Sequence, residues 1–316
     1  MELNGLHHVT AVTGDTKRNV IFYTDILGLR LVKKTVNQDD VSAYHLFYGD
    51  KSGSPGTELT FFDWPHLGQN RPGPGSIANT ALRVSGHDSL EWWAQRLTDH
   101  DIKHSGIVEF NGHAKINFTD PEGQHLALVD DEGKPGGVPW ENSPVPAAYA
   151  IRGLHSVTLS VGELEPTEFV LTEIMGYQKT AEYANQPGPG ERTAVYSLGE
   201  GGAGNEIYVV EQPDKPRGVL GRGGVHHVAF RVANEEEQRW WRQRITSYGL
   251  GVSDFINRFY FRSIYFPIPG NILFEIATDG PGFATDEDVE HLGESLALPP
   301  FLEPYRAQIE AGLQPI

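Results

Sequence analysis

Short apolar runs recur four times along the chain, at intervals of about 70 to 80 residues. Each run is followed by a polar break and then by apolar residues at helical spacing, which predicts a strand and then a helix. The four runs are Leu6–Val12, Ile77–Val84, Leu154–Val161 and Val225–Val232. The four expected helices are Lys17–Leu27, Ser89–His100, Pro166–Met175 and Glu235–Tyr248. Self-similarity over this length indicates one α+β unit that is copied four times.

Alternating apolar and polar residues follow each expected helix, with glycine at the turns, and this period of two predicts strands. The expected strands lie within Val41–Tyr48, Glu58–Phe62, Gly106–Phe118, His125–Asp130, Ala194–Leu198, Glu206–Glu211, Phe255–Phe266 and Ile272–Ala277. Each unit is therefore expected to be a βαβββ module.

Two kinds of helix alternate among the modules. Modules two and four share a tryptophan pair, Trp92-Trp93 and Trp240-Trp241, and we expect both pairs to pack into a core. Modules one and three instead share a glycine just after the helix, Gly28 and Gly176. Such a glycine suits a left-handed helix C-cap.

Composition limits the possible ligands and partners. The 316 residues include no cysteine, so any metal must be held by His, Asp or Glu. The formal net charge of −17 argues against a general nucleic-acid or anionic-membrane partner, because both require a basic face. No apolar stretch approaches the roughly 20 residues of a membrane span. A strand pattern begins soon after Met1, so no signal peptide is expected and a cytoplasmic location is the default.

Histidine doublets stand at the same position of two modules, in Leu-His-His-Val-Thr near residue 6 and Val-His-His-Val-Ala near residue 225. The second histidines are His8 in module one and His227 in module four. The same position holds Asn79 in module two and Ser156 in module three. Histidine at this position is therefore confined to the first and last modules.

A single acid, Glu275, stands in the last strand-like run of module four. Counted from the preceding glycine, its counterparts in the other modules are Phe61, Leu128 and Val209. Two imidazoles and one carboxylate on rigid strands form a mononuclear metal site with open positions, as in non-heme iron(II) oxygenases. We therefore predict a metal site of His8, His227 and Glu275.

The expected fold class is α+β, with four βαβββ modules forming two cupped mixed sheets. Modules one and four are expected to pair around the metal, and modules two and three to form a second, metal-free cup. Glycine- and proline-rich stretches punctuate the modules. They divide the chain into residues 1–145 with modules one and two, 146–280 with modules three and four, and a tail, 281–316. We expect the tail to wrap the body as a loop with a short helix.

These repeats and motifs resemble the vicinal oxygen chelate superfamily, which includes glyoxalase I, extradiol ring-cleaving dioxygenases and the fosfomycin- and bleomycin-resistance proteins. From Gly5 to Gly280, the chain resembles the ring-cleaving dioxygenases that open hydroquinones. The resemblance rests on the two doublets and on Arg258, Tyr265 and Glu275. It implies an Fe(II)-dependent enzyme that inserts O2 into a hydroquinone- or catechol-type aromatic diol.

The resemblance also implies polar groups around the substrate, at His7, Thr10, His226, Arg258 and Tyr265. Arg258 is a fixed cation able to stabilise a phenolate or a carboxylate product. Tyr265 can donate a hydrogen bond to an oxygen at the metal, and a histidine can accept a phenol proton. Strict strand alternation places His7 and His226 on the face opposite the ligands.

Alternatives remain open at this point. A glyoxalase-like isomerase is disfavoured because such enzymes usually use a second glutamate, where this chain has Phe61. A non-catalytic small-molecule-binding resistance protein is disfavoured by four modules and an intact ligand triad. The ligands also fit Mn(II) or another divalent ion. Homo-oligomers are possible, and the sequence does not separate hydroquinone from catechol substrates.

Overall fold

The computed structural model describes residues 1–184 and 192–316, and each module consists of a strand, a helix and three further strands. Module one contains β1 (Leu6–Thr13), α1 (Thr16–Val20) continued by a π-helical turn (Ile21–Ile26), β2 (Arg30–Asn37), β3 (Asp40–Gly49) and β4 (Glu58–Asp63). Module two contains β5 (Ser76–Val84), α2 (His87–Asp99), β6 (His104–Phe110), β7 (His113–Thr119) and β8 (His125–Asp130).

The second half of the chain repeats this order. Module three contains β9 (Leu154–Val161), α3 (Leu164–Phe169) continued by a π-helical turn (Val170–Ile174), β10 (Gln178–Ala184), β11 (Arg192–Ser197) and β12 (Glu206–Glu211). Module four contains β13 (Val225–Val232), α4 (Glu235–Ser247), β14 (Ile256–Asn257), β15 (Arg262–Ile268) and β16 (Ile272–Thr278). Five short helices complete these ranges: Ala147–Tyr149, Phe283–Thr285, Val289–His291, Glu303–Tyr305 and α5 (Arg306–Gly312).

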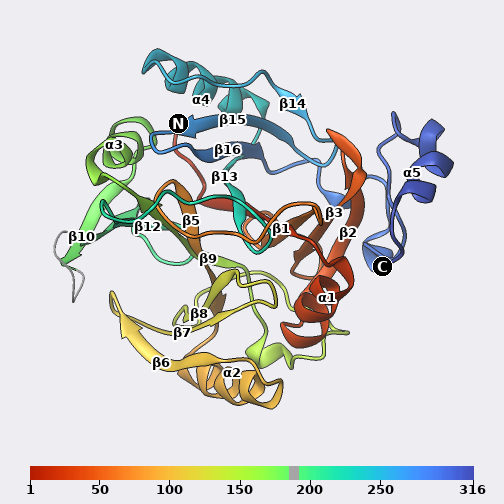
Figure 1. Ribbon diagram of the computed structural model, residues 1–316, viewed down its shortest axis with the longest axis horizontal. Helices are drawn as coiled ribbons and strands as arrows, with labels where there is room; N and C mark the ends of the chain where they lie inside the picture. Colours follow the sequence, from red (N-terminus) through yellow and green to blue (C-terminus); the bar gives the residue numbers. More distant parts are fainter. Residues whose placement is uncertain (185–191) are drawn as a thin grey trace.

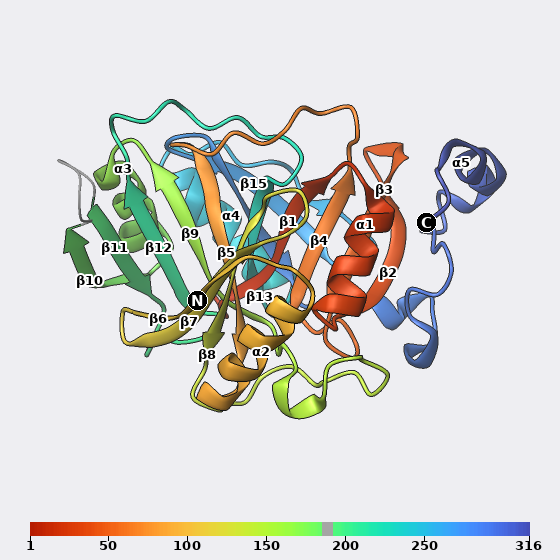
Figure 2. The same ribbon diagram turned by 60° about the horizontal axis from the view of Figure 1, so that its bottom comes forward.

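The first strands of the modules pair in the combination that the sequence predicts. β1 runs antiparallel to β13, and β5 runs antiparallel to β9. Each first strand also lies parallel to the last strand of its own module, as β1 does to β4 and β13 to β16. Modules one and four therefore form one curved sheet, the first cup, and modules two and three form the second cup (Figures 1 and 2). The two cups are joined where β13 lies beside β5, through a single antiparallel residue pair, Val225 with Ile77.

The helices lie on the outer side of the sheets (Figure 1). Asn234 caps the N-terminus of α4, and its side chain accepts from two backbone N–H groups of the first turn. Arg96 of α2 donates to the carbonyls that end the helix of module one, at Asp25 and Ile26. Arg244 of α4 does the same in module three. An arginine at a helix C-terminus satisfies free carbonyls and interacts favourably with the negative end of the helix dipole. Because each arginine belongs to the next module, these contacts connect modules one and two, and modules three and four.

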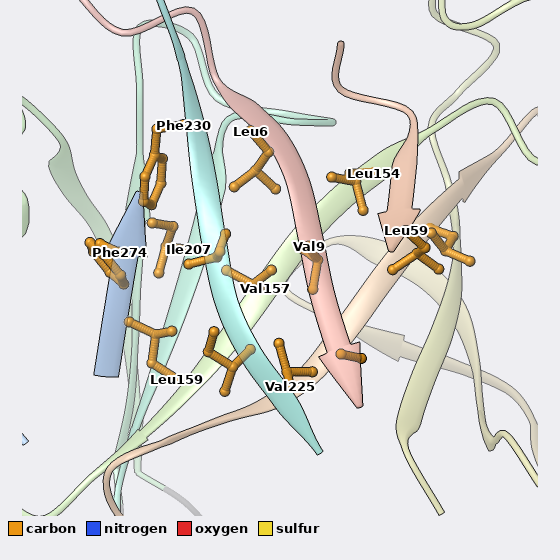
Figure 3. Packing of buried hydrophobic residues seen from close by; sticks show 14 of the residues in the cluster. Leu6, Val9, Leu59, Leu154, Val157, Leu159, Ile207, Val225, Phe230 and Phe274 are labelled. Carbon is orange, nitrogen blue, oxygen red and sulfur yellow. The ribbon is translucent and has the colours of Figure 1, made fainter. Parts of the chain in front are cut away.

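Apolar side chains from all four first strands form the core (Figure 3). Val9, Val157 and Phe230 have no exposed surface. Of the tryptophan pairs, which were predicted to pack into a core, Trp93 and Trp241 are buried, whereas Trp92 and Trp240 are half-buried against it. Burying side chains of this size contributes roughly 1.5 to 3 kcal/mol each. The core therefore holds both cups without any contribution from the predicted ligands.

The C-terminal tail packs along β2 and β3 at one end of the molecule (Figure 2). It supplies partners for Lys33, a fully buried side chain of β2: the amine donates to the Phe283 carbonyl and forms ion pairs with Asp286 and Glu287. A buried ammonium requires such pairing. None of the described helices is long and apolar enough to cross a membrane.

Candidate metal centre

His8, His227 and Glu275 lie together at the centre of the first cup. They stand on the three adjacent strands β1, β13 and β16. Their exposed fractions are 2%, 3% and 0%. The sequence prediction that these three residues gather at one place agrees with this geometry.

The nitrogen and oxygen atoms of the three side chains face a common point. Nε2 of His8 lies 3.3 Å from Nε2 of His227 and 3.3 Å from Oε2 of Glu275. Nε2 of His227 lies 2.9 Å from the same oxygen. Neither oxygen of Glu275 makes a well-aligned hydrogen bond within the described residues. Donor atoms about 3 Å apart suit an ion with bonds of about 2.1 Å, so the residues fit a divalent metal.

Electrostatics at this point favour metal binding. Burial acts to raise the pKa of Glu275, but His8 and His227 outweigh it and hold that pKa well below its usual value. Burial lowers the pKa of His227. The carboxylate is therefore ionised and the imidazole neutral near pH 7, which are the protonation states of metal ligands.

His7 fixes the orientation of His8. Nε2 of His7 lies 3.2 Å from the carbonyl oxygen of Thr278, which can only accept, so this nitrogen carries the proton. Burial lowers the pKa of His7 to about 3, and its Nδ1 is therefore an acceptor. Nδ1 of His8 lies 3.0 Å away and donates to it. His8 thus keeps the lone pair of Nε2 for a metal.

The second doublet repeats the contact between Nδ1 atoms. Nδ1 of His226 lies 2.8 Å from Nδ1 of His227, and burial lowers the pKa of His226 to about 3. The β1–β13 register shifts between Leu6 and Val9, where His7 and His8 stand. A β-bulge of this kind breaks strict alternation and lets consecutive histidines approach each other. Neither His7 nor His226 lines the cavity beside the ligands.

A cavity of about 30 Å³ adjoins the three ligands. Its walls combine aromatic and polar side chains from both modules. They are His8, Thr35, Val36, Asn37, Gln38, His45, Phe47, Phe62, His227, Arg258, Tyr260, Phe261 and Tyr265. A volume of this size holds one or two waters. An aromatic ring occupies more space than this.

Arg258 and Tyr265 provide the charge and the hydroxyl that face the cavity. Nη2 of Arg258 lies 2.8 Å from Oδ2 of Asp39, and its Nε lies 3.4 Å from the Tyr265 hydroxyl. Tyr265 stands opposite Glu275 in the β15–β16 pair. Burial and the Glu275 charge raise the pKa of Tyr265, although Arg258 opposes them. The phenol therefore keeps its proton near neutral pH.

His45 is a cavity residue that the sequence did not single out. It stands on β3, and burial lowers its pKa well below the usual value, helped by His8 and His227. Its Nε2 lies 2.9 Å from the Thr60 hydroxyl, which lies 2.8 Å from that of Thr10. Thr10 itself does not line the cavity. No motif marks His45, and the pairing of β3 with β2 and β4 brings it to the site.

The strand register corrects the counterparts of Glu275. Glu275 pairs with the residue two after His227, and the same register selects Thr60, Ala127 and Tyr208 in the other modules. Counting from the preceding glycine gave Phe61, Leu128 and Val209, each one residue too far. A one-residue slip moves a side chain to the other face, and Phe61 is indeed a core residue. The module-one counterpart still carries no carboxylate.

Comparisons with known proteins identify the family. A profile of the Glyoxalase/Bleomycin resistance protein/Dioxygenase superfamily matches residues 5–128. The chain is 48% identical over its full length to the "Putative ring-cleaving dioxygenase MhqA" of Bacillus subtilis (strain 168), and covers 100% of that protein. The chain belongs to this superfamily.

Other relatives agree with this family. The chlorohydroquinone/hydroquinone 1,2-dioxygenase of Sphingobium indicum is 32% identical, with 95% of this chain and 93% of that protein covered. A crystal structure of a "putative dioxygenase" from Bacillus subtilis subsp. subtilis str. 168 superposes with a TM-score of 0.90 at 39% identity. It covers 100% of this chain and 98% of that one. The vicinal oxygen chelate fold expected from the sequence is thereby confirmed.

Proposed function

We propose that the chain is an Fe(II)-dependent dioxygenase that cleaves the ring of a hydroquinone- or catechol-type aromatic diol. The observation that carries this proposal is the convergence of His8, His227 and Glu275, with both carboxylate oxygens buried and without a well-aligned hydrogen bond within the described residues. The names of the relatives that span the chain support the same chemistry. Iron(II) bound there would lower the pKa of a diol hydroxyl as a Lewis acid and supply the redox chemistry toward O2.

The cavity residues would bind and orient the diol. Arg258 offers a permanent cation to a phenolate or to a carboxylate product. Tyr265 keeps its proton and can donate to a substrate oxygen. His45 stays neutral because its pKa is lowered, and its imidazole can accept a hydrogen bond from a substrate hydroxyl. Phe47, Phe62 and Phe261 line the remaining wall and exclude water from the ring.

His7 and His226 would act through the ligands, because each hydrogen-bonds the Nδ1 atom of its neighbour and neither lines the cavity. Such partners orient a ligating imidazole and raise its basicity. We propose positioning roles for both. Thr10 is likewise connected to the cavity only through Thr60 and His45.

A glyoxalase-type reaction is less well supported. It would call for a second carboxylate from module one, and the register places Thr60 there. A hydroxyl is a weak ligand for a divalent ion compared with a carboxylate. Three protein ligands leave positions for substrate and O2, which an oxygenase needs.

The experiment is oxygen uptake by protein loaded anaerobically with Fe(II), using a panel of hydroquinones and catechols. Metal content is recorded in parallel, and Mn(II)-loaded protein tests the choice of ion. Iron-dependent uptake with a ring-opened product is the expected result, and the preferred diol class follows from the panel.

Glu275→Gln serves as the matched control, because it removes the ligand charge at nearly constant volume. Full iron content without oxygen uptake on any diol, combined with turnover of a methylglyoxal–thiol adduct, would reject the dioxygenase in favour of an isomerase. Equal uptake by wild type and Glu275→Gln would reject the site itself.

A further inference from the structure

The second cup contains its own cluster of potential metal ligands, built from both of its modules. His113 comes from β7, His155 from β9 and Glu206 from β12. One donor atom of each residue lies within 4.8 Å of the other two. Nε2 of His113 lies 3.7 Å from Oε1 of Glu206, and the two imidazole centroids are 5.0 Å apart. These distances place one donor atom of each residue near a common point.

This cluster does not use the positions of the first centre. His155 precedes Ser156 as His7 precedes His8. Glu206 pairs with Ser156 in the register by which Glu58 pairs with His8. The two residues are therefore the counterparts of His7 and Glu58, which lie beside the first centre.

The third ligand has no histidine counterpart in the first cup. His113 stands two residues before Lys115, whose position in the sheet matches that of Ser263. Its counterpart is accordingly Phe261, two residues before Ser263. Phe261 packs its ring 5.3 Å from that of His7. At this one position the first cup has a phenylalanine that packs against His7, and the second cup has a histidine that completes a three-donor cluster.

The cluster adjoins open space. A cavity of about 210 Å³ is lined by both histidines, whereas the cavity beside the first centre measures about 30 Å³. The difference has a local cause, since Ala127 stands at the position of Glu275 and Asn79 at that of His8. An ion at the cluster would keep coordination positions open toward this cavity.

A polar atom at the cluster lacks a partner. His155 is 1% exposed, and its Nε2 makes no hydrogen bond within residues 1–184 and 192–316. Its Nδ1 lies 3.2 Å from the Ser156 hydroxyl. A buried nitrogen without a partner is costly, and a metal bond would satisfy it. Glu206 is already held in place by the Tyr208 hydroxyl at 2.8 Å and the Gly202 N–H at 3.1 Å.

We propose that His113, His155 and Glu206 bind a divalent first-row transition ion in the second cup, independently of the first centre. Two imidazoles and a carboxylate suit Zn²⁺ or Fe²⁺, and the fixed carboxylate is the kind of supporting contact that metal ligands have. The sequence led us to expect a metal-free second cup. The cluster of donors there argues against that expectation.

Metal stoichiometry tests the proposal without any substrate. Apo-protein is titrated with Zn²⁺ by calorimetry, and the ions retained after gel filtration are counted by elemental analysis. Wild type is expected to bind two ions per chain, Glu275→Gln one, His113→Phe one, and the double variant none. His113→Phe installs the residue that the first cup uses at this position, and circular dichroism checks its fold. His125→Ala, an exposed histidine of the neighbouring strand, should still bind two.

Two outcomes would overturn the proposal: a wild type with a single ion that disappears in Glu275→Gln, or a His113→Phe variant that still binds two. If His113→Phe fails to fold, Glu206→Gln replaces it and should lose one ion. Oxygen uptake plays no part in this measurement, so a failure of the proposed dioxygenase activity would leave the stoichiometry unchanged.

Discussion

The two cups share strand order and register but differ in what the centre of each sheet carries. At one equivalent position the first cup has His8 and His227, and the second has Asn79 and Ser156. Glu275 of β16 corresponds to Ala127 of β8. The result is a small cavity beside three converging donors in one cup and a larger cavity in the other.

The residues that stabilise the fold are therefore distinct from the residues that form the candidate sites. The apolar core lies on the opposite face of the same strands, and residues such as Val9 and Val157 are buried in both cups alike. Because side chains alternate between faces, a residue facing the hollow of the cup can change without disturbing the core. Substitutions at the centre should therefore alter metal and activity much more than stability.

The largest effect is expected for Glu275→Gln. Removing the charge of the buried ligand takes away the group that draws a cation between the two imidazoles. We expect loss of iron from the first centre and a fall in kcat of at least about 10³-fold, given what metal activation contributes. Metal analysis and oxygen uptake measure this, with Glu109→Gln, at an exposed position of β6, as a control.

Tyr265→Phe should separate chemistry from metal binding. The hydroxyl is a hydrogen-bond donor at the cavity and not one of the three converging ligands. We expect unchanged iron content and a kcat lower by about 10²-fold, the lower end of what a positioned proton donor contributes. Steady-state kinetics at equal iron loading provide the measurement. Unchanged turnover would remove Tyr265 from the mechanism.

His226→Asn should weaken the centre without removing a ligand. Loss of the hydrogen bond to Nδ1 of His227 leaves that imidazole free to rotate. Metal affinity is expected to fall about 10- to 100-fold, as for other partners of ligating histidines. A competitive chelator titration measures the affinity. If the substitution slows turnover at saturating iron without changing affinity, His226 contacts the substrate instead.

The sequence predicted the modules and the ligand triad because both depend on repetition. Period-two alternation marks most strands, and the doublets stand out against Asn79 and Ser156. Strand β10 gave no signal, since most of its residues are exposed. Strand β2 gave none either, because it holds Lys33, whose burial depends on acids more than 250 residues away.

The sequence also did not predict sites that depend on contacts between residues far apart in the chain. The positions of His45 and His113 follow from pairings between strands and across modules, which no local pattern encodes. The doublets were judged by strict alternation, and the bulge in β1 sets that rule aside. The register of β4 against β1 decides between Thr60 and Phe61, and a count from a glycine misses it by one.

The smallest effect is expected for Asp39→Asn, which changes the partner of a cavity residue. Asp39 forms an ion pair with the cavity residue Arg258, and the Asp39 side chain is 71% exposed. Exposed pairs of this kind contribute about 0.2 to 1 kcal/mol, so KM should change by less than about fivefold with kcat preserved. In the second cup, the cavity cation Lys115 instead lies 4.6 Å from the centre of the Phe110 ring. A lower KM in the variant would show that Arg258 must leave Asp39 for the diol to bind, whereas a large loss of kcat would make Asp39 part of the reacting site.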